Sequence, residues 1–123
     1  MPKTPQQRVE PEDFQAVGMM LRENLLSLMR VLRGQVELGE GVKAPRGADF
    51  KEWSEVILNE LCPGEANKEL RSAMKAMADK TWGLVNWVTH DRDASRSSTL
   101  IAAQSCSTLR GHFTTLLFRD RMD

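Results

Sequence analysis

The chain has 123 residues, the length of a single domain with one sizeable core. It carries 17 Lys and Arg residues and 17 Asp and Glu residues, and this zero net charge argues against a generally basic nucleic-acid binder. No apolar stretch approaches the roughly 18 residues of a membrane helix, the start of the chain lacks the apolar core of a signal peptide, and two cysteines are too few for a disulfide scaffold. We therefore expect one cytoplasmic domain, residues 11–123, after a flexible polar lead-in at 1–10.

A first helix is predicted over residues 11–36. Pro11 suits the first helical turn, and two acidic residues follow it where they complement the helix dipole. Apolar residues then recur in steps of three and four, which is typical of a helix with one buried face. This stripe consists of Phe14, Val17, Leu21, Leu25, Leu28, Leu32 and Val36.

Residues 37–48 contain three glycines and one proline and show no hydrophobic period, so they are predicted to form a loop. The loop is long for a connection between helices. Its central part, 38–47, offers little apolar area to offset the entropy of ordering, and we expect it to be mobile. A second, shorter helix is predicted over 49–62, capped by Asp49 and ended by Pro63 and the glycine after it. Its apolar stripe is Phe50, Trp53, Ile57 and Leu61.

Two further helices are predicted over 65–90 and 95–119. Gly83 lies inside the earlier one, where it would let another helix approach closely, and Asp93 or Ser95 can cap the later one. Each helix has an apolar stripe at helical spacing. The stripe of the earlier helix is Leu70, Met74, Met77, Thr81, Leu84 and Val88, and that of the later one is Ala102, Cys106, Leu109, Phe113 and Leu116.

No segment alternates apolar and polar residues as a strand does, so the chain is predicted to be all-α. Three long helices and one short helix, each with a single apolar stripe, can bury those stripes together as an antiparallel four-helix bundle. Short connections after the second and third helices place those neighbours antiparallel, whereas the long first loop leaves the packing of the second helix open. The expected core includes Leu25, Leu28, Ile57, Met77, Leu84 and Phe113.

The densest polar cluster follows the third predicted helix. It holds four candidate catalytic residues, His90, Arg92, Asp93 and Arg96. In a catalytic interpretation His90 is a general acid or base, Asp93 orients it, and an arginine holds a phosphate. In a structural interpretation His90 faces the C-terminal dipole of the third helix and Asp93 caps the fourth. Because the connection is short, we expect His90, Asp93 and Arg96 to lie near one another.

The other chemically capable side chains favour structural roles. His112 is expected on the polar side of the last helix, and Cys62 and Cys106 are expected to be buried thiols without a catalytic partner. Trp82 and Trp87 are five residues apart, so both cannot point to the centre of one stripe, and an exposed one is a candidate interface anchor. No nucleotide-binding loop, dinucleotide fingerprint or zinc-ligand spacing is present, so neither a cofactor nor a metal is predicted. Five methionines are compatible with an adaptable binding surface, but at helical spacing we expect them to fill gaps in the core. They are Met19, Met20, Met29, Met74 and Met77.

Within residues 81–118, a predicted helix ends in an NWxTH signature and turns into a second helix. The signature residues are Asn86, Trp87, Thr89 and His90. This stretch resembles the C-terminal half of a group of uncharacterised bacterial helical proteins and is similar to the HEPN superfamily of small four-helix bundles. Members of that superfamily occur in toxin–antitoxin and phage-defence systems and often act as metal-independent ribonucleases. Active members carry an arginine followed four to six residues later by a histidine, and neither His90 nor His112 has an arginine at that spacing. The family's catalytic pair therefore cannot be carried over to this chain.

Two functions are compatible with these features. The preferred hypothesis is a non-catalytic helical bundle that acts through protein–protein contacts, as a homodimer or as an accessory protein of a bacterial defence or toxin–antitoxin operon. It rests on the lack of a complete catalytic set, the balanced charge and the Trp and Met residues of the helices. The alternative is a HEPN-like ribonuclease with a composite site around His90, Arg92 and Arg96, completed by a second chain. RNA is a partner only in the alternative, and neither hypothesis involves a membrane.

Overall fold

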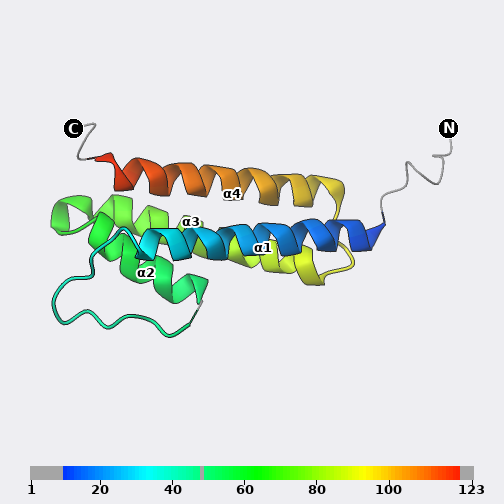
Figure 1. The fold of residues 1–123 in the computed structure, drawn as a ribbon. Coiled ribbons are helices and arrows are strands. Elements are labelled where there is room, and N and C mark those ends of the chain that lie inside the picture. The colour runs from blue at the N-terminus through cyan, green and yellow to red at the C-terminus, as the bar shows by residue number, and fades with distance from the viewer. Residues whose placement is uncertain (1–9, 48, 120–123) are drawn as a thin grey trace.

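The computed structural model describes residues 10–47 and 49–119, and within these ranges it contains α-helices and no strand (Figure 1). The prediction of an all-α chain with three long helices and one short helix is confirmed. The helices are α1 (Pro11–Arg33), α2 (Phe50–Leu61), α3 (Lys68–His90) and α4 (Arg96–Leu117), and a 3-10 turn, η2 (Glu65–Asn67), leads into α3. The expectation of a flexible lead-in at 1–10 lies outside the described residues except for Glu10.

Local side-chain caps explain where the helices begin and end. Asp49 accepts a hydrogen bond from the backbone N–H of Glu52 at 3.2 Å and caps α2 as predicted. Helix α4 is capped by Ser95, whose hydroxyl accepts from the N–H of Ser98 at 3.1 Å. The structural role predicted for Asp93 as this cap is therefore wrong. The Asp93 N–H instead donates to the Asp91 carboxylate at 2.8 Å, which shapes the turn between α3 and α4.

Helix α1 ends three residues before the predicted boundary. Gly34 follows Arg33, and its N–H donates to the Val31 carbonyl at 3.2 Å in a tightened final turn. Glycine loses more backbone entropy in a helix than other residues do, which favours ending α1 at Gly34. Val36, the last residue of the predicted stripe, still packs against the core from the loop.

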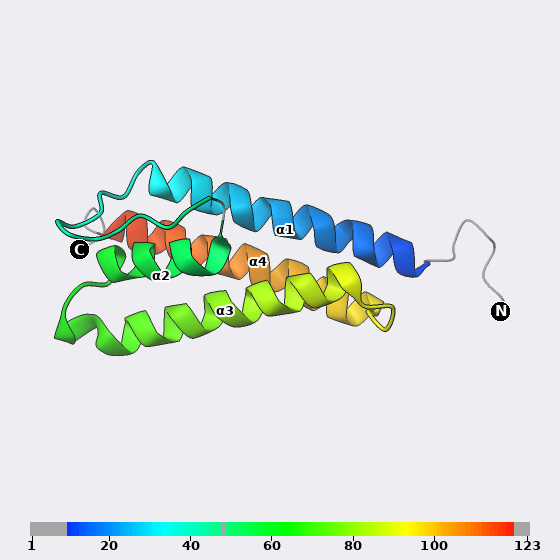
Figure 2. The same ribbon diagram turned by 90° about the horizontal axis from the view of Figure 1, so that it is seen from below.

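The helices α1, α2 and α4 run in the same direction, and α3 runs in the opposite one (Figures 1 and 2). The pairs α2–α3 and α3–α4 are antiparallel, as their short connections predict. Helices α1 and α2 are parallel because the segment between them runs back along α2. The N–H of Gly39 donates to the Glu60 carboxylate at 2.9 Å near the end of α2, and the Trp53 indole N–H donates to the Gly47 carbonyl at 3.0 Å near its start. These two anchors restrict the loop, so the mobility expected for 38–47 stays a prediction for the residues between them.

Apolar side chains from all four helices form one core. Helices α1, α3 and α4 pack against one another, and α2 packs against α1 and α3. The largest fully buried side chains are Phe50, Phe113, Leu25, Ile57, Leu58, Leu109, Val85, Val88 and Cys62. Leu25, Leu28, Ile57 and Phe113 are buried as predicted, and the α4 stripe is buried along its whole length.

The predicted core positions of Met77 and Leu84 are wrong, because both side chains are only partly buried. The buried stripe of α3 instead runs through Met74, Ala78, Thr81, Val85 and Val88. Two apolar stripes at helical spacing overlap on α3. The larger side chains of Met77 and Leu84 led the sequence prediction to the stripe that is only partly buried.

The rotation of the buried stripe gives a direct stability test. Val85→Ala is expected to lower the free energy of unfolding by about 2 kcal/mol, because Val85 is fully buried. Leu84→Ala removes more carbon but is expected to cost only about 1 kcal/mol, because its side chain is partly exposed. Urea denaturation of both variants measures the difference. A larger loss at Leu84 than at Val85 would contradict the observed orientation of α3.

Helices α1 and α3 approach each other very closely at Gly18. A Cβ atom on Gly18 would lie 2.8 Å from the backbone nitrogen and 2.9 Å from the Cα of Thr89, closer than real Cβ contacts allow. Gly83, which the sequence suggests as the site of a close helix approach, has no atom within 4 Å of such a Cβ. That prediction is wrong, and Gly18 has the role expected of Gly83.

No helix of the described residues is both long and apolar enough to cross a membrane.

Candidate functional site: a groove between α1 and α3

Helix α2 covers only part of the surface between α1 and α3. It has 12 residues, whereas α1 and α3 have 23 each. Its first residue, Phe50, stacks on Trp82 in the middle of α3, with ring centroids 4.9 Å apart. Beyond this stack α3 continues to His90 and α1 extends back to Pro11, and no described helix covers them on the side of α2 (Figure 2).

The uncovered stretch contains a groove of about 570 Å³. It is lined by Met19, Met20, Arg22, Glu23, Thr89 and His90. Met19 is 61% exposed and Met20 is 66% exposed, although burial of these apolar side chains would be favourable. The groove therefore combines exposed apolar side chains with a few polar groups, the composition of a binding surface.

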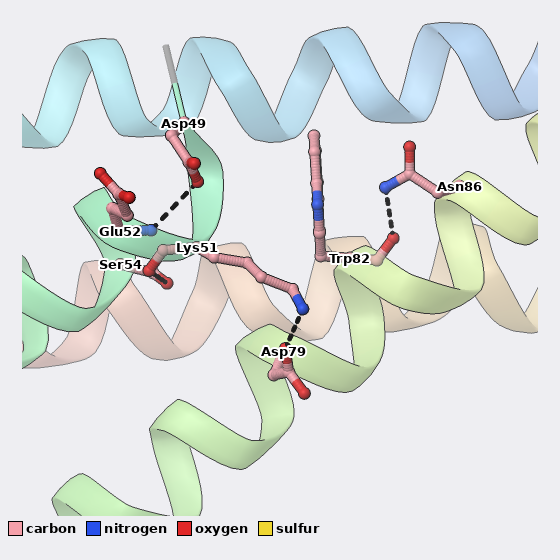
Figure 3. A network of polar contacts seen from close by, with 7 residues as sticks. All are labelled: Asp49, Lys51, Glu52, Ser54, Asp79, Trp82 and Asn86. Atoms are coloured by element: carbon pink, nitrogen blue, oxygen red, sulfur yellow. Dashed lines mark hydrogen bonds and ion pairs between the residues drawn. The ribbon is translucent and has the colours of Figure 1, made fainter. Parts of the chain in front are cut away.

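Arg22 connects the groove to Trp82, next to the start of α2. The Trp82 side chain points from α3 towards α1 (Figure 3), and the Arg22 guanidinium carbon lies 5.4 Å from its ring centre. One turn further along α3, the Asn86 side-chain amide donates to the Trp82 carbonyl at 2.8 Å (Figure 3). Trp82 therefore contacts both Phe50 of α2 and Arg22 of the groove.

The close approach of Gly18 to Thr89 joins the two walls of the groove. The Thr89 hydroxyl donates to the Val85 carbonyl at 2.8 Å, so this hydroxyl is already satisfied within α3. Because backbone atoms meet at this contact, the separation of α1 and α3 is set by sterics rather than by adjustable side chains. The walls are consequently rigid, whereas the methionines on them can adapt their shape.

The charges around the groove are mixed in sign. Arg22 and His90 face it together with Glu23, and Glu23 forms an exposed ion pair with Arg30 at 3.6 Å. Phosphate-backbone recognition relies on several lysines or arginines that act together. One arginine with a neighbouring carboxylate does not supply such a field, so the groove is better suited to a protein segment than to RNA.

Of the four candidate catalytic residues, His90 lines the groove. It lies in the last turn of α3, whereas Arg92, Asp93 and Arg96 are exposed in or after the turn to α4. Within the described part of the chain, no ion pair or side-chain hydrogen bond joins any of these four side chains to another. In the groove His90 has Thr89 and the α1 residues as neighbours, which sequence reasoning did not include, and a catalytic role for the four residues stays a prediction.

Met19 and Met20 are the groove residues that sequence reasoning misplaced. They are expected in the core, yet both are largely exposed, while Met29 and Met74 are buried as predicted. Helical spacing gives a signal for Met20 but not for Met19. Met19 lies two turns before the buried Leu26 on the same side of α1, so spacing alone places it with the buried residues.

The two tryptophans have different environments. Trp82 is partly buried in the stack with Phe50, and Trp87 is 39% exposed. Trp87 therefore remains the candidate interface anchor. His112 is partly buried and lines a separate hollow between α3 and α4, so its expected position on a plain polar surface is only partly correct.

Both cysteines are free and buried, in agreement with the structural role predicted for them. Burial raises the pKa of the Cys106 thiol to about 11, and the charge of Arg110 acts in the opposite direction. Burial also raises the pKa of Cys62, against the opposing effect of Arg119 and Arg71. Within the described ranges, no group of three or more His, Cys, Asp or Glu side chains is placed to hold a metal ion.

The raised pKa values of the two thiols predict a slow reaction with disulfide reagents and a protein stability that depends on pH. Folded protein at neutral pH is expected to react with a disulfide reagent far more slowly than unfolded protein, since the thiolate is the nucleophile. In the unfolded chain the Cys106 thiol loses its proton near the ordinary pKa of 9.0, whereas in the folded chain it keeps the proton up to about pH 11. Stability is therefore expected to fall as the pH rises through this interval, because the folded state binds the extra proton. Rapid labelling of native protein at pH 7 would contradict the buried position of the thiols.

No family model matches the chain, and neither a curated protein nor a solved structure matches it significantly.

Proposed function

We propose that the four helices form a bundle domain that binds a partner protein in the α1–α3 groove and performs no catalysis. The observation that carries this proposal is the incomplete coverage of α1 and α3 by α2, which leaves Met19 and Met20 exposed over a rigid base. In its biological setting we place the protein in the cytoplasm, as an accessory protein of a bacterial defence or toxin–antitoxin operon. Its free, buried thiols are compatible with a reducing compartment.

Helix α2 indicates what kind of segment fits the groove. It buries Phe50, Trp53, Ile57 and Leu58 against α1 and α3, as an amphipathic helix does in a groove. Ion pairs flank this contact, from Lys51 to Asp79 at 2.9 Å (Figure 3) and from Glu55 to Lys75 at 2.9 Å. An amphipathic helix of a partner, placed in line with α2, would bury the two methionines in the same manner. The rim beside it offers Arg22 and Glu23 for polar contacts of either sign.

The ribonuclease alternative has less support. It needs a base and cations that converge on one phosphate, and only His90 of the candidate residues lines the groove. Arg22 also lines the groove, but the carboxylate of Glu23 lies beside it, so no set of cations converges near His90. The departure of the chain from the arginine–histidine spacing of active HEPN proteins points in the same direction.

A paired set of variants tests the binding proposal. Replacing Met19 and Met20 together by glutamate is expected to abolish recovery of the native partner from cells that produce the protein. It should also weaken binding of that purified partner by at least about 100-fold. The matched control is Val31→Glu, since Val31 is also exposed on α1 (56%) but does not line the groove. A partner that binds the double variant as tightly as the wild type would contradict the proposal.

The same preparations distinguish the alternative. Purified wild-type protein is expected to leave total RNA intact. Cleavage by the wild type that disappears in a fully folded His90→Ala variant would establish the ribonuclease function instead. Thermal denaturation of His90→Ala provides the folding control.

A further inference from the structure

The outer face of α4 carries almost no charge. Charged residues make up 28% of the chain, yet none occurs among the 13 residues 97–109, which form more than half of α4. Solvent-facing helices usually carry charges on their outer surface. Depletion of charged residues is the compositional mark of the centre of a protein–protein interface.

Exposed apolar side chains lie on the same side of the molecule. Ile101 on α4 is 53% exposed, and Leu70 on α3 is 42% exposed. The partly buried Met77 lines one hollow with Leu70 and another with Ile101, which places these side chains of α3 and α4 on one face. Figure 1 shows α4 along one edge of the molecule with no other helix beyond it.

A furrow follows the contact between α3 and α4. It consists of two hollows, of about 390 Å³ beside Leu70 and His112 and about 280 Å³ beside Ile101 and Thr108. Met77 lines both hollows, so they are consecutive parts of one depression. Apolar side chains that project from a facing surface would have places to enter.

We propose that this α3–α4 face is the interface of a homodimer related by a two-fold axis. An acidic or basic partner would find no complementary charges along residues 97–109, whereas a second copy meets no like-charge repulsion there. In a two-fold pair each copy contributes both the projecting side chain, Ile101, and the furrow that receives it, so the face is self-complementary. The net charge of zero also leaves no long-range repulsion between copies.

The available area is sufficient for a stable dimer. Helix α4 has 22 residues and is therefore about 33 Å long, and two adjacent helices are roughly 20 Å wide, which gives about 650 Å² per copy. Specific interfaces bury on the order of 600–1,000 Å² on each partner. The α1–α3 groove lies on a different face, lined by other residues, so dimerisation leaves it open.

The test uses two positions with matched exposure, Ile101 in the proposed interface and Val31 outside it. Analytical ultracentrifugation of the wild-type chain up to about 100 μM is expected to show a reversible dimer, since interfaces of this size reach micromolar affinity or better. Ile101→Arg is expected to weaken the dimer by at least about 100-fold, because it buries unpaired charge in the interface. Val31→Arg is the control, since Val31 is 56% exposed, lies on α1 outside the α3–α4 face and lines neither hollow.

Circular dichroism confirms that each variant folds. A wild-type dimer that Ile101→Arg dissociates and Val31→Arg preserves supports the proposal. A wild-type chain that stays monomeric at about 100 μM overturns it. So does a dimer that resists Ile101→Arg, including one that the Met19 and Met20 double variant dissociates instead. If the Met19 and Met20 double variant dissociates the dimer, the two copies contact each other through the α1–α3 groove. If it loses partner binding but still dimerises, the result bears only on the partner site proposed in the groove.

Discussion

Gly18→Ala is expected to lower the free energy of unfolding by about 1–3 kcal/mol, although alanine favours a helix by about 1 kcal/mol over glycine. The new Cβ would lie 2.8 Å from the backbone nitrogen of Thr89, and backbone cannot rotate away as a side chain can. Helices α1 and α3 must therefore move apart, which opens the packing on both sides of the contact. Thermal or urea denaturation measures the loss.

Gly83→Ala is the matched control for this prediction. Gly83 also lies inside a long helix, but a Cβ there meets no atom within 4 Å. The substitution is expected to raise the free energy of unfolding by about 0.5–1 kcal/mol through helix propensity alone. Changes of the same sign at both positions would show that the contact between Gly18 and Thr89 is less tight than observed. Because Thr89 also lines the groove, Gly18→Ala should weaken partner binding as well.

The contrast between these glycines shows how far the sequence alone could reach. Helix positions follow from local information, since a cap such as Asp49 and the spacing of apolar side chains act within a few residues. Whether a glycine meets a neighbouring helix depends on which face of its own helix points inward. Gly18 belongs to the buried face of α1 through its spacing to Leu25, whereas Gly83 lies opposite the buried stripe of α3.

The groove could not be predicted because it depends on the direction of α2. A connection of 16 residues can place the next helix parallel or antiparallel to α1, and the sequence pattern of α2 is the same in both cases. The hydrogen bonds from Gly39 to Glu60 and from Trp53 to Gly47 hold the connection along α2, and the first of them joins residues 21 positions apart in the chain. Only then does a short α2 leave one stretch of α1 and α3 uncovered. His90 could be selected from the sequence as a polar residue at a helix end, but its neighbours Met19 and Met20 could not be assigned to it.

Phe50→Ala is expected to have the largest effect of any single substitution considered, a loss of about 3–5 kcal/mol in the free energy of unfolding. Phe50 is fully buried, begins α2 and stacks on Trp82 at an interplanar angle of 17°, so its removal leaves a cavity and ends an aromatic contact. Phe50→Leu retains most of the apolar volume and is expected to cost about 1–1.5 kcal/mol. The difference between the two losses in the free energy of unfolding measures the cost of the cavity.

The position of Phe50 also predicts where the protein opens first. Helix α2 packs against α1 and α3 and has only three turns, so losing its first anchor should release it before the longer helices separate. Hydrogen exchange of Phe50→Ala is therefore expected to show faster exchange across Phe50–Leu61 than across Arg96–Leu117. Equal acceleration in both helices would mean that α2 and the rest of the core unfold as one unit. In the expected case Trp82 loses the ring that holds it, and the groove extends into the space of α2. A partner helix that occupies the groove would then bind this variant in a longer register, which is the behaviour expected if α2 and the partner share one continuous surface.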